Sequence, residues 1–248
     1  MPTIDSYMQK YKTTKTNYNK ISNSNEKEGT SSPFYDYSSV DELEKLGTVI
    51  SYPKNQLLVK TGQYTDYCYI VKKGTVVAYE NYEGGKQRIY SIYEKNSLFL
   101  ESTLLFDQPV TIAYRTLCKT ELLCIKKGTL MTAMEAEPKL AMVLMKSISD
   151  KMFTFMEQIR SENNHDVTWR VGDMIINLAE EYGVQSDEKT IINKKLKQKT
   201  MAQILGANRV TVARSIKKLK EMKFIDYIDG LFCVYDIDHL KNYTYGHS

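Results

Sequence analysis

The sequence lacks the long apolar run that a membrane-spanning helix needs. No stretch of about 18 uncharged apolar residues occurs in its 248 residues, and the polar N-terminal segment has no apolar centre of the signal-peptide kind. We therefore expect a cytoplasmic protein that makes no membrane contact. The length is enough for two modest domains with a substantial buried core.

Cysteine is scarce, and its spacing argues against the common cysteine sites. No CxxC pair occurs among the four cysteines, which are Cys68, Cys118, Cys124 and Cys233. An iron–sulfur cluster needs four clustered thiolates. We expect free, mostly buried thiols in a reducing compartment.

Histidine is also rare. The three histidines are His165, His239 and His247, and none lies in the strand-rich region described below. Haem and a cupin-type metal enzyme are therefore disfavoured, because such a barrel needs several histidine or carboxylate ligands. We predict no metal, no cofactor and no catalytic activity; the cupin-type enzyme stays an alternative that bound metal would reveal.

Acidic residues are nearly missing from one segment of a chain whose net charge is only +4. Residues 189–223 hold nine lysines and two arginines against one glutamate, a local net charge of +10. A solvated basic face would intersperse acids among the bases. The imbalance instead indicates a polyanionic partner.

Four regions follow one another along the chain. Residues 1–34 are polar and predict an N-terminal arm, and residues 35–137 are rich in β-branched and aromatic residues with turn signals at short intervals, among them Gly84-Gly85. They predict a jelly roll or small barrel. Residues 138–166 predict one long helix, and residues 167–248 a mainly helical domain, so the fold class is α+β.

The long helix carries an apolar seam with spacings of 3 and 4. The spacing predicts a parallel two-helix dimer interface, with packing inside the chain as the alternative. A second row, at Leu140, Val143 and Leu144, would pack on the barrel. The seam begins at Ala141, and its candidate interface residues are Met145, Ile148, Met152, Phe155 and Ile159.

The basic segment contains a helix–turn–helix pattern, "QKTMAQILGANRVTVARSIKKLKEMKF". Gly206-Ala207 permits the tight turn, Asn208 can cap the second helix, and the buried stripe is Val212, Ile216 and Leu219. An ordinary helical hairpin with a charged face is the alternative. The Asp229-Gly230 turn between apolar runs then predicts a β-hairpin wing.

The other face of the second helix is left for double-stranded DNA. Arg214 is a candidate for pairing with guanine, Val210 for a thymine methyl, and Thr211 for a base or phosphate. Arg209 would hold a phosphate, and Lys199, Lys217 and Lys218 would add sequence-independent affinity.

This order of parts resembles the Crp/Fnr family of bacterial transcription regulators. The resemblance covers about residues 35–240 and is strongest in "QILGANRVTVARSIKKLK", where six residues fall on the family's usual positions: Gln203, Gly206, Arg209, Thr211, Val212 and Arg214. It implies a β-roll of the cyclic nucleotide-binding type, a dimerisation helix and a winged helix-turn-helix. It also implies a homodimer on a palindromic operator, and RNA polymerase as partner if the protein is an activator.

The sequence departs from the family pattern at two places. Val210 stands where the family often has a base-reading glutamate; Val210-Thr211-Val212 and the "NSL" of residues 96–98 are similar to a CprK-like subgroup. In the roll, Leu100 replaces the glycine before Glu101, and no arginine lies at residues 110–113 to neutralise a cyclic phosphate. We therefore expect an effector other than cyclic AMP.

The roll is rich in tyrosine, which suits a small aromatic or phenolic ligand as well as half-buried strands. A constitutive DNA-binding regulator with no effector is the alternative. The candidate effector pocket comprises Glu101, Tyr90, Tyr114 and Arg115.

Overall fold

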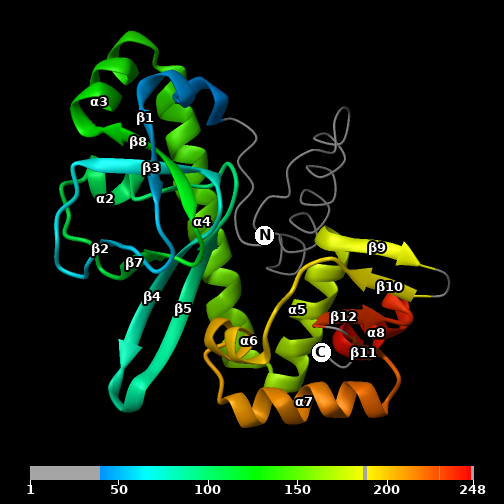
Figure 1. Ribbon diagram of the computed structural model, residues 1–248. Helices are drawn as coiled ribbons and strands as arrows, with labels where there is room; N and C mark the ends of the chain where they lie inside the picture. Colours follow the sequence, from blue (N-terminus) through cyan, green and yellow to red (C-terminus); the bar gives the residue numbers. More distant parts are fainter. Residues whose placement is uncertain (1–39, 187–188, 229, 247–248) are drawn as a thin grey trace, which may run out of the picture.

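The computed structural model describes residues 40–186, 189–228 and 230–246, so the predicted arm at residues 1–34 lies outside the described residues. Two bodies are joined by a long helix, α4 (Lys139–Asn164) (Figure 1). Over the described ranges, no helix has both the length and the apolar character needed to cross a membrane.

The first body is a β-roll of two four-stranded antiparallel sheets. One sheet has the order β1-β8-β3-β6 and the other β2-β7-β4-β5. Their strands are β1 (Thr48–Tyr52), β2 (Leu57–Val59), β3 (Tyr67–Lys73), β4 (Val76–Tyr82), β5 (Lys86–Tyr93), β6 (Leu98–Phe99), β7 (Ala113–Thr116) and β8 (Thr120–Lys126). The predicted roll is confirmed, because inward residues of both sheets form one apolar core.

Short helices close the roll, and the sequence did not indicate them. They are η1 (Val40–Leu46), α2 (Glu101–Leu105) and α3 (Lys127–Ala136). The predicted hairpin at Gly84-Gly85 is confirmed: these glycines lie in η2 (Glu83–Gly85) between β4 and β5, and both have positive φ. Only glycine takes that conformation at little cost.

The second body, called the C-terminal domain below, comprises four helices and a four-stranded sheet of order β11-β12-β10-β9. Its helices are α5 (Val167–Tyr182), α6 (Gln198–Ile204), α7 (Arg209–Glu221) and α8 (Ile237–Tyr245), and α8 was not predicted. The strands are β9 (Gly183–Ser186), β10 (Lys189–Ile192), β11 (Ile225–Ile228) and β12 (Leu231–Val234). The paired strands β11 and β12 confirm the predicted wing.

Gly183 forms the junction between α5 and β9. Its φ is −71°, and it begins β9 directly after α5. Glycine is needed because a Cβ there would lie too close to the carbonyl oxygen of Ala179 and 2.6 Å from Cγ2 of Thr190. The tight helix-to-strand junction therefore depends on a close approach.

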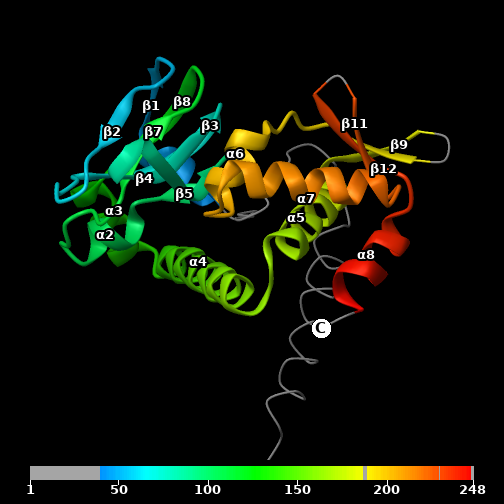
Figure 2. The ribbon, with the colours of Figure 1, turned by 90° about the horizontal axis from the view of Figure 1, so that it is seen from below.

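The two bodies touch beside the long helix. Figures 1 and 2 both show α6 next to β5, and residues of these elements are in contact. Strand β5 is therefore the part of the roll nearest to the helix–turn–helix.

Candidate nucleic-acid interface and roll interior

The turn between α6 and α7 has the geometry that its sequence predicts. Gly206 has a φ of +59°, and the Ala207 amide donates to the carbonyl oxygen of Ala202. Asn208 caps α7, because its Oδ1 accepts a 2.8 Å hydrogen bond from the Val210 amide. The direction in which α7 leaves the turn is thus fixed locally.

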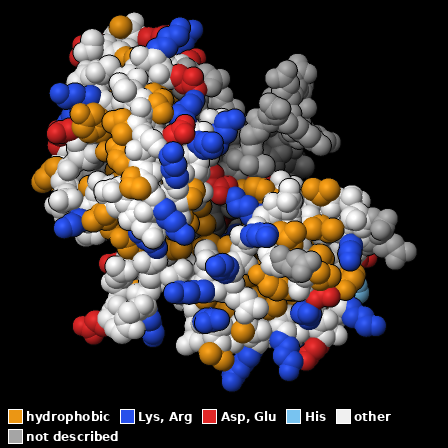
Figure 3. Space-filling model, viewed as in Figure 1, with side chains coloured by type: hydrophobic (Ala, Val, Ile, Leu, Met, Phe, Trp, Pro, Cys, Tyr) orange, Lys and Arg blue, Asp and Glu red, His pale blue; other side chains and the backbone are white. Residues whose placement is uncertain are grey.

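The two faces of α7 separate as its apolar spacing predicts. Val212, Ile216 and Leu219 are buried, and the buried hydroxyl of Ser215 lies 3.1 Å from that of Thr168 on α5. The candidate DNA-binding residues all lie on the surface, at Arg209, Val210, Thr211, Arg214, Lys217, Lys218 and, on α6, Lys199. Lys and Arg side chains gather along the lower edge in Figure 3, where α7 lies.

Val210 is the apolar member of this face. It is 56% exposed, and it stands at the N-terminal end of α7 beside two charged or polar neighbours. More than half of this side chain is therefore open to solvent. It is available for an apolar contact with a partner.

The C-terminal end of α7 is tied to the wing. Lys220 pairs with Asp226 of β11 at 2.5 Å, and this hydrogen bond is the main reason why the pKa of Asp226 is lowered. Lys217 makes an exposed 3.6 Å pair with Glu221. Arg209, Arg214 and Lys218 have no such acidic partner among the described contacts, so unpaired positive charge is present from the first to the last turn of α7.

A buried ion pair joins the roll to α4. Glu101, at the start of α2, is 1% exposed, accepts a 2.6 Å hydrogen bond from the Ser147 hydroxyl and pairs with the Lys151 ammonium. Lys151 also lies 3.2 Å from the Ser147 hydroxyl. Burial lowers the pKa of Lys151, and the charge of Glu101 opposes that shift.

The residue before Glu101 is held in an unusual backbone conformation. Leu100 has a φ of +66°, in the left-handed region that a leucine rarely adopts, and its side chain is buried. Packing in the core therefore holds the entry of α2 in place.

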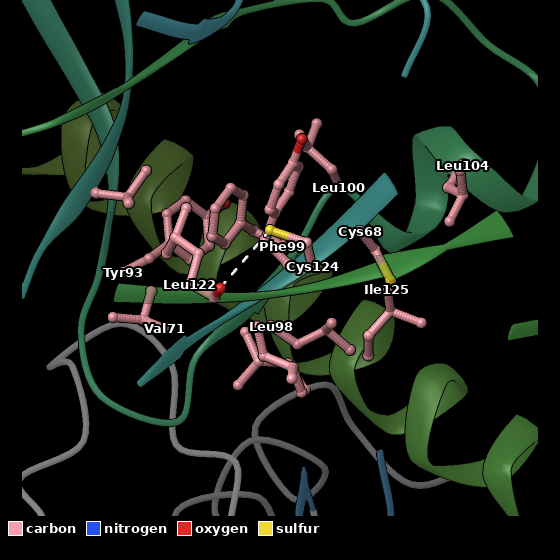
Figure 4. Packing of buried hydrophobic residues seen from close by; sticks show 14 of the residues in the cluster. Cys68, Val71, Tyr93, Leu98, Phe99, Leu100, Leu104, Leu122, Cys124 and Ile125 are labelled. Atoms are coloured by element: carbon pink, nitrogen blue, oxygen red, sulfur yellow. Dashed lines mark hydrogen bonds between the residues drawn. The ribbon is translucent and has the colours of Figure 1, made fainter. Parts of the chain in front are cut away.

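Aromatic rings fill the neighbouring part of the roll. Phe99 stacks on Tyr69 and Tyr114 with centroid distances of 5.2 and 5.5 Å, and Tyr93 lies 5.0 Å from Phe99. Figure 4 shows Tyr93 and Phe99 among the buried aliphatic side chains and close to Cys124. Of the four candidate effector residues, Glu101 and Tyr114 lie in this interior.

The other two candidates lie on the outer face of their sheet. Tyr90 is 2.5 Å from the Tyr82 hydroxyl and donates to Glu80 at 3.0 Å. Arg115 lies between the buried residues of β7, and its guanidinium is 4.8 Å from the Tyr79 ring and donates to Gln87 at 2.8 Å. The structure does not bring Tyr90 and Arg115 to Glu101.

The long helix α4 has a buried and an exposed apolar face. Leu140, Leu144 and Ser147 are buried toward the roll. Among the predicted interface residues, Met145, Met152 and Ile159 are exposed, whereas Ile148 and Phe155 are half-buried. We call five exposed apolar residues of α4 the exposed seam: Met142, Met145, Met152, Met156 and Ile159. With the half-buried Ser149 between Met145 and Met152, their spacings are 3, 4, 3, 4 and 3.

Sequence reasoning missed Ser147 and Lys151 as site residues. Both continue the buried row of α4, because Ser147 lies three residues after Leu144 and Lys151 lies four residues after Ser147. A lysine in such a row signals a buried charge that needs an acidic partner. Within the described ranges, no group of three or more His, Cys, Asp or Glu side chains could hold a metal ion.

The matches to known protein families fall on the same two bodies. Residues 49–137 match the family of cyclic nucleotide-binding domains, and residues 170–243 match the family of Crp-like helix-turn-helix domains. The chain is 25% identical over 179 residues to the "Global nitrogen regulator" of Nostoc sp. (strain PCC 7120), covering 71% of this chain and 80% of the relative. It is 24% identical over 188 residues to the "cAMP-activated global transcriptional regulator CRP" of Salmonella typhimurium, covering 74% and 88%.

Solved structures share the fold at lower identity. A CprK structure complexed with OCPA superimposes with a TM-score of 0.69 at 18% identity, covering 87% of this chain and all of that chain. A mutant of CooA from Carboxydothermus hydrogenoformans gives a TM-score of 0.71 at 18% identity, covering 82% and 89%. The roll, the long helix and the C-terminal domain therefore recur together in known proteins.

Proposed function

Because the chain belongs to the Crp/Fnr family and is a DNA-binding transcription regulator of that type, we propose that it acts as a homodimer on a palindromic operator. The exposed face of α7 carries this proposal. It presents Val210, Thr211 and Arg214 together, while the buried stripe and the Asn208 cap fix the helix behind them. Side chains at the N-terminal part of such a helix reach base edges in the major groove.

The contacts divide by their chemistry. Arg214 pairs with guanine O6 and N7, and Val210 contacts a thymine methyl. Arg209, Lys199, Lys217 and Lys218 neutralise phosphates, so affinity falls with salt. Because Val210 cannot accept a hydrogen bond from cytosine, the half-site differs from those read by a glutamate at this position.

Two copies pair through the exposed seam of α4. Its large apolar side chains recur at heptad spacing along the helix, and burying them on a second copy gives a parallel two-helix interface. The pairing sets two α7 helices about one DNA turn, about 34 Å, apart. Acting on operator DNA, the protein works in the cytoplasm, with RNA polymerase as partner if it is an activator.

The effector of the roll is a small molecule other than cyclic AMP. A cyclic phosphate buried beside Glu101 needs a cation, and the nearby Arg115 faces the opposite side of its sheet. The one buried cation beside Glu101 in the described contacts, Lys151, already pairs with that carboxylate.

A constitutive regulator without an effector is the second candidate. Two features of the roll interior favour this function. Glu101 and Lys151 neutralise each other's charge, and the rings of Tyr69, Phe99 and Tyr114 stack on one another, so these groups have partners without a ligand. Titration calorimetry with candidate metabolites, combined with DNA binding with and without each one, separates the two candidates. Binding of a metabolite that alters operator affinity supports the effector-controlled regulator.

Selection of operators from random double-stranded DNA tests the DNA contacts. We expect Arg214→Ala to lose about 1–3 kcal/mol of discrimination at one base pair of each half-site. Lys217→Ala should weaken binding to all sequences and reduce the salt slope by about 1 per subunit. Lys126→Ala, on the exposed surface of the roll, is the control that changes neither. Unchanged base preference in Arg214→Ala refutes the assignment.

A further inference from the structure

One carboxylate of the roll holds the C-terminal domain at two points. Glu94, which directly follows β5, is 9% exposed. Its Oε2 accepts a 3.0 Å hydrogen bond from the Tyr182 hydroxyl, and its Oε1 pairs with the Lys194 ammonium. That ammonium also lies 4.6 Å from the centroid of the Tyr182 ring. We call Glu94, Tyr182 and Lys194 the Glu94 clasp.

The clasp is rigidly attached to the roll. The Glu94 amide donates to the Ser97 hydroxyl at 3.1 Å, and the Ser97 amide donates back to the Glu94 carbonyl at 2.9 Å. The preceding residue, Tyr93, points inward, packs on Phe99 and has the Lys151 ammonium 6.0 Å from its ring. Tyr93 therefore lies beside the buried ion pair of the roll, and the next residue, Glu94, contacts the C-terminal domain.

In the C-terminal domain, the clasp contacts the elements against which α7 packs. Tyr182 is the last residue of α5, which packs against α7, and Lys194 lies in the segment that leads into α6. The carboxylate therefore fixes the end of α5 and the approach to α6 together.

Strand β5 makes a second contact near the α6–α7 turn. Gln203 of α6 donates to the side-chain oxygen of Gln87 at 3.2 Å. The Arg88 guanidinium pairs with Glu162 near the end of α4 and lies against Gly206, where a Cβ would collide with it. The C-terminal domain thus meets β5 at both ends of one strand.

Building on the homodimer proposed above, we propose that Glu94 is a positioning residue, through which the roll sets the place of α7 and hence the spacing of the two half-sites. Glu94 bonds to Tyr182 of α5 and to Lys194 before α6, so it acts on α7 through these elements. Burial is the main reason why the pKa of Tyr182 is raised, and the charge of Glu94 is the next. The phenol therefore stays protonated and remains the hydrogen-bond donor to Glu94.

The test uses the full-length protein and two kinds of DNA. Operators selected by the wild-type protein define a half-site and a palindrome. Affinity is then measured for each DNA with Tyr182→Phe, which removes only the hydroxyl, and Lys194→Met, which removes only the charge. Lys241→Met is the matched control, because it breaks the Lys241–Glu180 pair inside the C-terminal domain.

We expect both clasp variants to keep the half-site preference and affinity while losing about tenfold in affinity for the palindrome. Hydrogen exchange of residues 190–206 in the absence of DNA should rise in both and stay unchanged in Lys241→Met. A merely structural role would lower half-site and palindrome affinity together.

The proposal is overturned if both clasp variants keep the wild-type ratio of palindrome to half-site affinity. It is equally overturned if hydrogen exchange in residues 190–206 is unchanged in both variants. Failure of the wild-type protein to select any palindrome would instead refute the homodimeric operator binding on which the proposal rests.

Discussion

Replacement of Met152 by alanine should weaken the proposed α4 dimer by an amount that the structure allows us to estimate. Met152 lies in the exposed seam and is 52% exposed in the single chain. Full burial of a methionine side chain contributes about 1.5–3 kcal/mol, so the exposed half still has about 1 kcal/mol to gain. In a symmetric dimer the loss counts twice, and about 2 kcal/mol corresponds to about a 30-fold higher dissociation constant.

Sedimentation equilibrium over a range of protein concentrations measures this constant directly. Met131→Ala, on α3 and 38% exposed, is the control that should leave dimerisation unchanged. Met156→Ala should match Met152→Ala, since both lie in the exposed seam. A wild-type protein that stays monomeric, or a Met152→Ala dimer as tight as the wild type, would refute the reasoning.

Three further predictions concern stability, measured by urea unfolding. Lys223 is exposed, follows α7 and has a φ of +59°. Its replacement by glycine should raise the free energy of unfolding by about 1 kcal/mol, because glycine adopts this conformation without strain. Gly183→Ala should cost about 1–3 kcal/mol because of the clash with Ala179, whereas Gly128→Ala, with open space around it, should cost nothing. Glu101→Gln removes the charge that raises the pKa of Lys151 and leaves the burial that lowers it. The unfolded variant then binds more protons than the folded one at pH values below the ordinary pKa of lysine, so its stability should rise as the pH approaches that pKa, and adding Lys151→Met should abolish this rise.

The recognition element could be predicted because its signals are local. The turn glycine, the Asn208 cap and the buried stripe of α7 all lie within a few turns of one another, and each has a direct physical meaning in sequence. The roll was predictable as a class for the same reason, from strand composition and turn residues. The bounds of its short helices were not, since α2 depends on a strained Leu100 that only tertiary packing holds.

The polar contacts that join the roll to the C-terminal domain and to α4 could not be predicted, because their partners are distant in sequence. Tyr182 and Glu94 are 88 residues apart, and Ser147 and Glu101 are 46 apart. Helical spacing places Ser147 on the buried face of α4, but no local sequence pattern identifies Glu101 as its hydrogen-bond partner. The predicted grouping of Tyr90 and Arg115 with Glu101 failed to form for a related reason: neighbouring residues of a strand point to opposite faces.

The same alternation offers a route from the interior of the roll to the C-terminal domain. Tyr93 faces the buried ion pair, and Glu94, one peptide further on, faces the C-terminal domain. Lys151 belongs to that ion pair and also to α4, whose opposite side carries the exposed seam. In the proposed dimer, a displacement of the Glu101–Lys151 pair would act on the partner copy through α4 and on α7 through the end of β5. Since both routes begin at the same two side chains, we expect the separation of the α7 helices and their orientation to change together.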